Sequence, residues 1–96
     1  MTPEKRVQNS IIKYLSTLSD NVFYERRQAG GFSYKKGIPD LYAVVNGIHV
    51  EIEVKKLGGQ LSSMQEKFRD KCYRLNILWI CAEDVSEVKE LIESLL

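Results

Sequence analysis

Apolar and polar residues follow helical and strand-like spacings in turn along the chain. Apolar positions recur at helical spacing over residues 3–18, 62–75 and 85–95. Four β-like runs cover residues 22–28, 40–45, 48–55 and 77–82. The resulting order, helix, three strands, helix, strand and helix, predicts an α/β fold in which helices flank a mixed β-sheet.

The clearest local signal is the dipeptide Asn46-Gly47 between two β-like runs. It predicts a hairpin, because a type I′ turn needs positive φ at both central residues. A two-residue turn also sets the register, in which Asp40 lies opposite Glu53. One face of this hairpin is entirely apolar and is expected to pack on the core. Its members are Leu41, Ala43, Val45, Ile48, Val50, Ile52 and Val54.

The other face of the hairpin brings two carboxylates together at its open end. Opposed like charges destabilise a sheet, so Asp40 and Glu53 call for a cation between them. Lys55 lies on the same face, and Mg²⁺ with its preference for oxygen ligands would suit the pair. These groups are what metal-assisted hydrolysis of a phosphodiester requires. The alternative is a solvated face with a Glu53–Lys55 ion pair. Glu51 is expected to be a solvent-facing or auxiliary acid, and His49 is expected to lie on the surface.

Composition indicates one globular domain over residues 1–96, with 44% hydrophobic and 28% charged residues. The chain has no apolar run of the roughly 20 residues that a membrane helix needs, so no membrane association is expected. The N-terminal residues do not resemble a signal peptide. Two cysteines, Cys72 and Cys81, form neither a disulfide framework nor a zinc spacing, which favours a reducing, cytoplasmic location.

Charge is unevenly distributed although the net charge is only +1. Residues 1–39 carry seven Lys or Arg and three acids, and residues 76–96 carry one Lys and five acids. This asymmetry favours a side that faces a polyanion and an opposite acidic side. Chance variation between surface elements explains it equally well.

Several motifs in the same order resemble a nuclease family. Gly37-Ile38-Pro39-Asp40-Leu41 followed by Glu53-Val54-Lys55 resembles the PD-(D/E)xK nuclease signature. With Glu4 in the first helix and Leu61-Ser62-Ser63-Met64-Gln65 at the second, the chain resembles the VRR-NUC (virus-type replication-repair nuclease) family over nearly its whole length. The resemblance implies a restriction-endonuclease-like αβββαβ core, here followed by a C-terminal helix.

The resemblance also implies a site for a metal-dependent DNA endonuclease that uses Mg²⁺ or Mn²⁺. Its metal ligands would be Asp40, Glu53, the backbone carbonyl of Val54 and, directly or through water, Glu4. Lys55 would be the catalytic lysine, and Gln65 would lie near the active site. Two residues have a structural alternative: an acid such as Glu4 is favoured in a first helical turn, and Gln65 completes a capping box with Ser62.

Basic residues flank the proposed site and would contact DNA phosphates. The expected contacts are Arg26, Arg27, Lys35, Lys36 and Lys56, with Tyr34 or Phe32 stacking on an unpaired base. Stand-alone members of the resembled family imply a homodimeric Holliday-junction resolvase of phage origin that acts in the host cytoplasm. The alternatives are a nuclease-fold DNA-binding module without catalysis, a nickase or flap-type endonuclease on other branched DNA, and a structural protein.

Overall fold

The computed structural model describes residues 1–18, 20–27 and 37–96. Its elements are α1 (Pro3–Ser16), β1 (Val22–Arg26), β2 (Leu41–Val45), β3 (Ile48–Val54), α2 (Ser63–Arg74), β4 (Leu78–Ala82) and α3 (Val85–Leu95). This confirms the predicted order, although α1 ends two residues earlier than expected. Within the described residues, no helix is long and apolar enough to cross a membrane.

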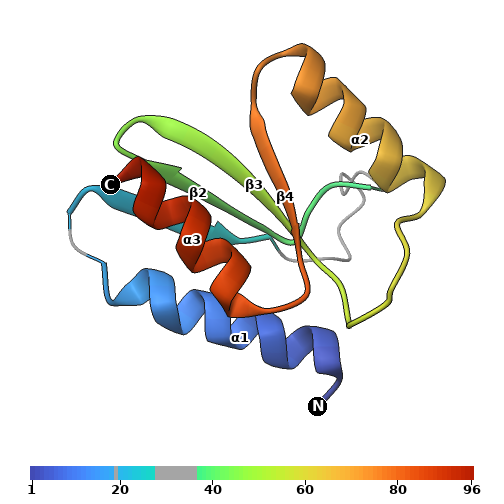
Figure 1. Cartoon of the computed structure of the whole chain (residues 1–96), viewed down its shortest axis with the longest axis horizontal. Coiled ribbons are helices and arrows are strands. Elements are labelled where there is room, and N and C mark those ends of the chain that lie inside the picture. Colours follow the sequence, from blue (N-terminus) through green and yellow to red (C-terminus); the bar gives the residue numbers. More distant parts are fainter. Residues whose placement is uncertain (19, 28–36) are drawn as a thin grey trace.

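One mixed sheet with strand order β1-β2-β3-β4 organises the molecule (Figure 1). β1, β2 and β3 are antiparallel neighbours, and β4 lies parallel to β3 after the crossover through α2. The predicted hairpin is confirmed, because Val45 pairs with Ile48 and Leu41 with Ile52. Asn46 and Gly47 have φ values of 49° and 81°, as a type I′ turn requires.

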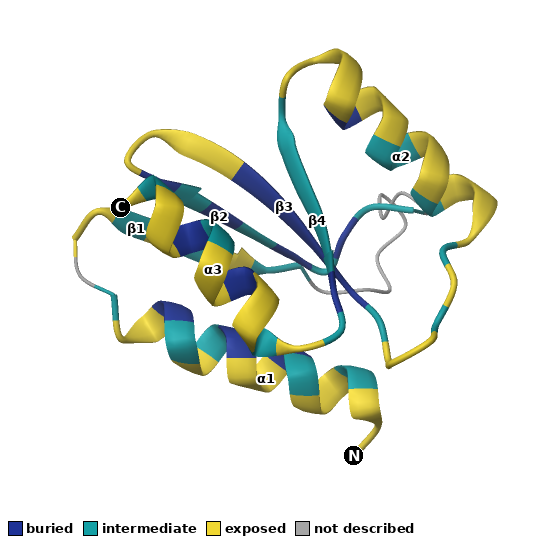
Figure 2. Ribbon diagram, viewed as in Figure 1, coloured by how far each residue is buried: buried dark blue, intermediate teal, exposed yellow. Residues whose placement is uncertain are grey.

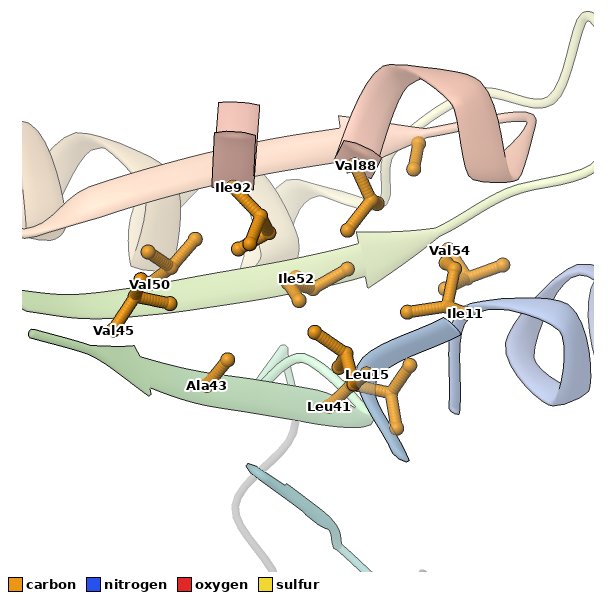
Figure 3. Packing of buried hydrophobic residues seen from close by; sticks show 11 residues of the cluster. Ile11, Leu15, Leu41, Ala43, Val45, Val50, Ile52, Val54, Val88 and Ile92 are labelled. Carbon is orange, nitrogen blue, oxygen red and sulfur yellow. The ribbon is translucent and has the colours of Figure 1, made fainter. Parts of the chain in front are cut away.

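The core lies between one face of the sheet and the layer formed by α1 and α3 (Figure 3). The helices contribute Ile11 and Leu15 from α1 and Val88 and Ile92 from α3, all at most 1% exposed. The predicted apolar face of the hairpin supplies the other side, with one correction. Ile48 is 41% exposed, because it begins β3 beside the turn at the end of the sheet.

Helix α2 packs on the opposite face of the sheet, near β4 (Figure 1). The ring of Tyr73 meets that of Trp79 edge to face, with centroids 6.3 Å apart. Cys72 is the buried residue of this helix, and most of its remaining surface is exposed (Figure 2). The predicted apolar face of α2 is therefore only partly buried. Met64 in the first turn is exposed, and so is Leu75, which follows the last residue of the helix.

Within the described residues, the basic N-terminal helix and the acidic C-terminal helix do not lie on opposite sides of the molecule. The basic helix α1 and the acidic helix α3 pack against each other in one layer (Figure 1). Lys89 of α3 lies over the ring of Tyr14 of α1, 5.4 Å from its centroid. The alternative of variation between neighbouring surface elements therefore describes the two helices better than opposite basic and acidic sides.

Candidate functional site

Three predicted site residues meet at the open end of the β2–β3 hairpin. Asp40 immediately precedes β2, Glu53 is the penultimate residue of β3, and Lys55 follows that strand directly. The charges of both Asp40 and Lys55 act on the Glu53 carboxyl. The backbone N–H of Lys55 donates to the carbonyl of Ala82 in β4 at 3.0 Å, which ties this end of the hairpin into the sheet.

The carboxyl group of Glu53 is buried, and its hydrogen bonds and nearby charges do not fully offset the cost of burying its ionised form. It is 3% exposed, and its Oε1 has no hydrogen-bond partner within the described residues. Burial first, and then the nearby charge of Asp40, raise the pKa of Glu53 from 4.5 to about 7. Lys55 and the backbone N–H of Val54 oppose this shift without cancelling it. A bound cation would favour the ionised carboxylate and offset its cost of burial.

Asp40 is held through both its backbone and its side chain. Its carbonyl oxygen accepts a hydrogen bond of 2.7 Å from the backbone N–H of Arg27. Its Oδ2 accepts one of 2.8 Å from the side-chain amide of Gln8. The residue that follows β1 and a residue of α1 therefore both fix the position of this carboxylate.

The loop before Asp40 passes directly against the start of α2. Gly37 has a φ of +86°, and a Cβ atom there would lie 2.5 Å from the carbonyl oxygen of Met64. Only glycine combines this backbone conformation with so close an approach. The family-like motif before β2 and the one at the start of α2 are thus neighbours in space.

The first turn of α1 faces the site. The charge of Glu4 contributes to the raised pKa of Glu53, although it is the smallest of the causes. Glu4 is half-buried and lies one turn before Gln8 on the same face of the helix. The structure therefore brings Glu4 toward Asp40 and Glu53, and its role as a metal ligand stays a prediction.

Gln65 takes part in the predicted capping box. Its side-chain oxygen accepts from the backbone N–H of Ser62 at 2.8 Å, and its own backbone N–H donates to the Ser62 hydroxyl at 3.2 Å. The capping alternative is confirmed, and a catalytic contribution of Gln65 stays a prediction. Val54, whose carbonyl was predicted to bind metal, is the buried last residue of β3.

The two adjacent arginines predicted to contact DNA have protein partners on different elements. Arg26 donates through Nη2 to the side-chain oxygen of Asn9 on α1 at 2.6 Å. Arg27 instead contacts Glu51 of β3 on the face of the sheet that α2 partly covers. Lys56 is exposed beside Lys55. The predicted DNA contacts Tyr34, Lys35 and Lys36, and with them Phe32, lie outside the described residues.

Glu51 does not face solvent, contrary to the prediction from strand alternation. It is 4% exposed, because Arg27 and His49 cover its carboxylate. Arg27 donates through Nη1 and Nη2 at 2.6 and 2.7 Å, and Nε2 of His49 lies 2.5 Å from Oε2. His49 is exposed, as predicted, and its ring stacks on that of Tyr42 with centroids 5.2 Å apart.

Gln8 is a site residue that was absent from the predicted set. It is 8% exposed and holds the carboxylate of Asp40. The sequence contained a signal for it, because Glu4, Gln8, Ile11 and Leu15 follow one helical stripe. A polar residue within an otherwise inward-facing stripe indicates a buried polar contact.

Replacement of Gln8 by leucine is expected to lower the free energy of unfolding by about 1–3 kcal/mol, because Asp40 loses a charge-assisted hydrogen bond. Urea unfolding followed by Trp79 fluorescence would measure this. The matched control is Gln60→Leu at an exposed position, where little change is expected. Equal effects of the two substitutions would contradict the importance of the Gln8–Asp40 contact.

The residues at this site fit a divalent cation with a small number of protein ligands. Among the described residues, no group of three or more His, Cys, Asp or Glu side chains is placed to hold a metal ion. Mg²⁺ is commonly bound by one or two carboxylates, with water and substrate phosphate completing its coordination. Asp40 and Oε1 of Glu53, which has no hydrogen-bond partner among the described residues, match that requirement.

Comparisons with solved structures identify the fold. A structure described as "VRR_NUC domain" superposes with a TM-score of 0.79 at 20% sequence identity, and the match covers 97% of each chain. Another, described as "VRR_NUC domain protein", gives a TM-score of 0.78 at 15% identity over 100% of this chain and 89% of the other. No family model and no curated protein matches the sequence. The fold of this chain is that of the VRR-NUC domain, as the order of its motifs and elements predicted.

Proposed function

We propose that this protein is an endonuclease that uses Mg²⁺ or Mn²⁺ to hydrolyse phosphodiester bonds in branched DNA, with four-way junctions as its substrate. The observation that supports this most directly is the state of Glu53. Its carboxyl group is buried, and one of its oxygens has no hydrogen-bond partner in the described structure. The charges of Asp40 and Lys55 both act on it. The VRR-NUC fold provides the context in which such a site serves a nuclease.

The residues of the site have separable roles in this proposal. Asp40, Glu53 and the carbonyl of Val54 would hold the cation, and Glu4 would assist directly or through water. The bound cation would supply positive charge to the scissile phosphate and lower the pKa of a bound water. The Lys55 ammonium would stabilise negative charge that develops on the phosphate, or orient the attacking water. Gln8 and Arg27 keep Asp40 in place.

DNA binding in this proposal relies on phosphate contacts around the site. Lys56 is the exposed candidate beside Lys55, and the predicted contacts Lys35, Lys36 and Tyr34 would extend the surface. Such contacts carry no sequence information, so selectivity would come from the shape of the DNA. A homodimer would offer two active sites to two strands of a junction. Binding would weaken steeply as the salt concentration rises.

Cleavage of a labelled four-way junction tests this function. The purified protein is incubated with the junction and with a linear duplex of matched sequence, in Mg²⁺, in Mn²⁺ or in EDTA. Asp40→Asn serves as the variant with an impaired site. We expect paired nicks in the junction that require metal and are absent from the duplex and from the variant.

Each other outcome changes the proposal in a defined way. Cleavage of flaps or nicked duplexes in preference to the junction would retain the nuclease and reject junction resolution. DNA binding without cleavage of any substrate would favour a DNA-binding module. Cleavage that persists in EDTA would contradict the assigned role of the metal.

A further inference from the structure

A partly buried ion-pair network, centred on the buried carboxylate of Glu51, lies beside the proposed metal site on the same face of the sheet. The two oxygens of the Glu51 carboxylate accept hydrogen bonds from Nη1 and Nη2 of Arg27, at 2.6 and 2.7 Å. The guanidinium lies over the ring of Tyr42, 4.7 Å from its centroid. Glu51 is 4% exposed, so this charge is almost completely removed from water. Paired arms of this kind fix the orientation of a guanidinium better than a single contact does.

Arg27 uses this fixed orientation to hold the backbone on both sides of Asp40. Its Nη1 donates to the carbonyl of Pro39 at 2.8 Å, and its backbone N–H donates to the carbonyl of Asp40 at 2.7 Å. The two peptide units that flank the Asp40 Cα atom are therefore both attached to one residue. Since the orientation of these peptide units sets the direction of the side chain, Arg27 restricts where the Asp40 carboxylate can point.

We infer that Glu51 and Arg27 are positioning residues for the metal-binding carboxylate of Asp40. Glu51 acts through Arg27 and touches neither metal nor substrate. This inference rests on the proposed function, because it takes Asp40 as a metal ligand. Groups that orient metal ligands commonly change metal affinity or activity by about 10–100-fold when they are removed. Gln8 completes the arrangement by holding Oδ2 of Asp40 from the side of α1.

Calorimetric titration of Mn²⁺ into the metal-free protein tests the inference without any cleavage measurement. Glu51→Gln preserves the shape of the side chain but removes the charge that holds Arg27. We expect Mn²⁺ to bind this variant about 10-fold more weakly than the wild type. His49→Ala is the matched control, because the ring of His49 contacts Glu51, whereas the hydrogen bonds described above to Pro39 and Asp40 come from Arg27 and Gln8. Its Mn²⁺ affinity should stay within about twofold of the wild type.

A second pair of variants separates positioning from a general loss of stability. Arg27→Lys keeps a positive charge near Glu51 but cannot hold Glu51 and Pro39 with one planar group. It should also weaken Mn²⁺ binding, and it serves in place of Glu51→Gln if that protein does not fold. Val88→Ala truncates a core residue of α3 and should lower the unfolding free energy while leaving Mn²⁺ affinity unchanged.

The outcomes distinguish this inference from the proposed function. If folded Glu51→Gln and Arg27→Lys bind Mn²⁺ as tightly as the wild type does, the positioning role alone is overturned. An equal loss of affinity in Val88→Ala would also overturn it, because loss of stability would then explain the effect. A wild-type protein that binds no Mn²⁺ would contradict the proposed metal site itself and the positioning role that depends on it.

Discussion

Replacing Glu53 with glutamine is expected to reduce metal-dependent DNA cleavage by at least roughly 1,000-fold while the protein remains folded. Glutamine has nearly the same shape as glutamate, but it carries no negative charge to hold a divalent cation. The carboxylate is 3% exposed, so water and buffer ions are poor substitutes for its contribution. Initial rates of junction cleavage at saturating Mg²⁺, with wild type and variant at equal concentration, provide the measurement.

The matched control for this prediction is an exposed carboxylate on the same sheet. Glu25 of β1 is exposed and pairs with Tyr42, and Glu25→Gln makes the same chemical change at a residue outside the proposed set of metal ligands. Its cleavage rate should stay within about twofold of the wild type, as expected for a surface change. If Glu53→Gln retained a tenth or more of the wild-type rate, Glu53 would not be an essential metal ligand.

The same substitution is expected to stabilise the metal-free protein above neutral pH. The pKa of Glu53 is raised from 4.5 to about 7 in the folded state, so the folded state binds more protons than the unfolded state between these values. The contribution of Glu53 to the free energy of unfolding therefore falls as the pH rises from about 4.5 to 7. Each unit of pKa difference corresponds to about 1.4 kcal/mol, which sets an upper limit of about 3.5 kcal/mol.

Urea unfolding of wild type and Glu53→Gln in EDTA, at pH 5 and pH 8, measures this contribution. The stability difference between the two proteins should grow in favour of the variant by about 2–3 kcal/mol between these pH values. Taking this difference removes the contributions of other titrating groups that both proteins share. A difference that does not change with pH would show that Glu53 ionises normally in the folded protein.

Adding metal provides an independent test of whether the buried Glu53 carboxylate destabilises the metal-free protein. Mg²⁺ or Mn²⁺ that binds the folded state should raise the stability of the wild type at pH 8, by an amount that grows with the metal concentration. Glu53→Gln should respond much less, because it lacks the charge that attracts the cation. An equal response of both proteins would place the metal elsewhere. The destabilisation by Glu53 is thus a cost that the bound metal would offset.

Local sequence patterns were sufficient for the order of the elements and for much of the site. Asn46-Gly47 determined the hairpin register, because only a primed turn suits two residues with positive φ. That register placed Asp40 and Glu53 at the same end of the hairpin. Capping residues predicted where α1 and α2 begin, since Thr2 and Ser62 both accept hydrogen bonds from the first turn.

Long-range contacts decided what alternation along one strand could not show. Glu51 looked like a solvent-facing residue because strand alternation describes a face and not its covering, and here Arg27 and His49 bury the carboxylate. Gln8 donates a hydrogen bond to Asp40, which lies 32 positions away in the sequence. Local periodicity cannot predict a contact at that separation. Within the described part of the chain, Oε1 of Glu53 has no hydrogen-bond partner, and this too depends on the tertiary structure, because burial is a property of the packed molecule.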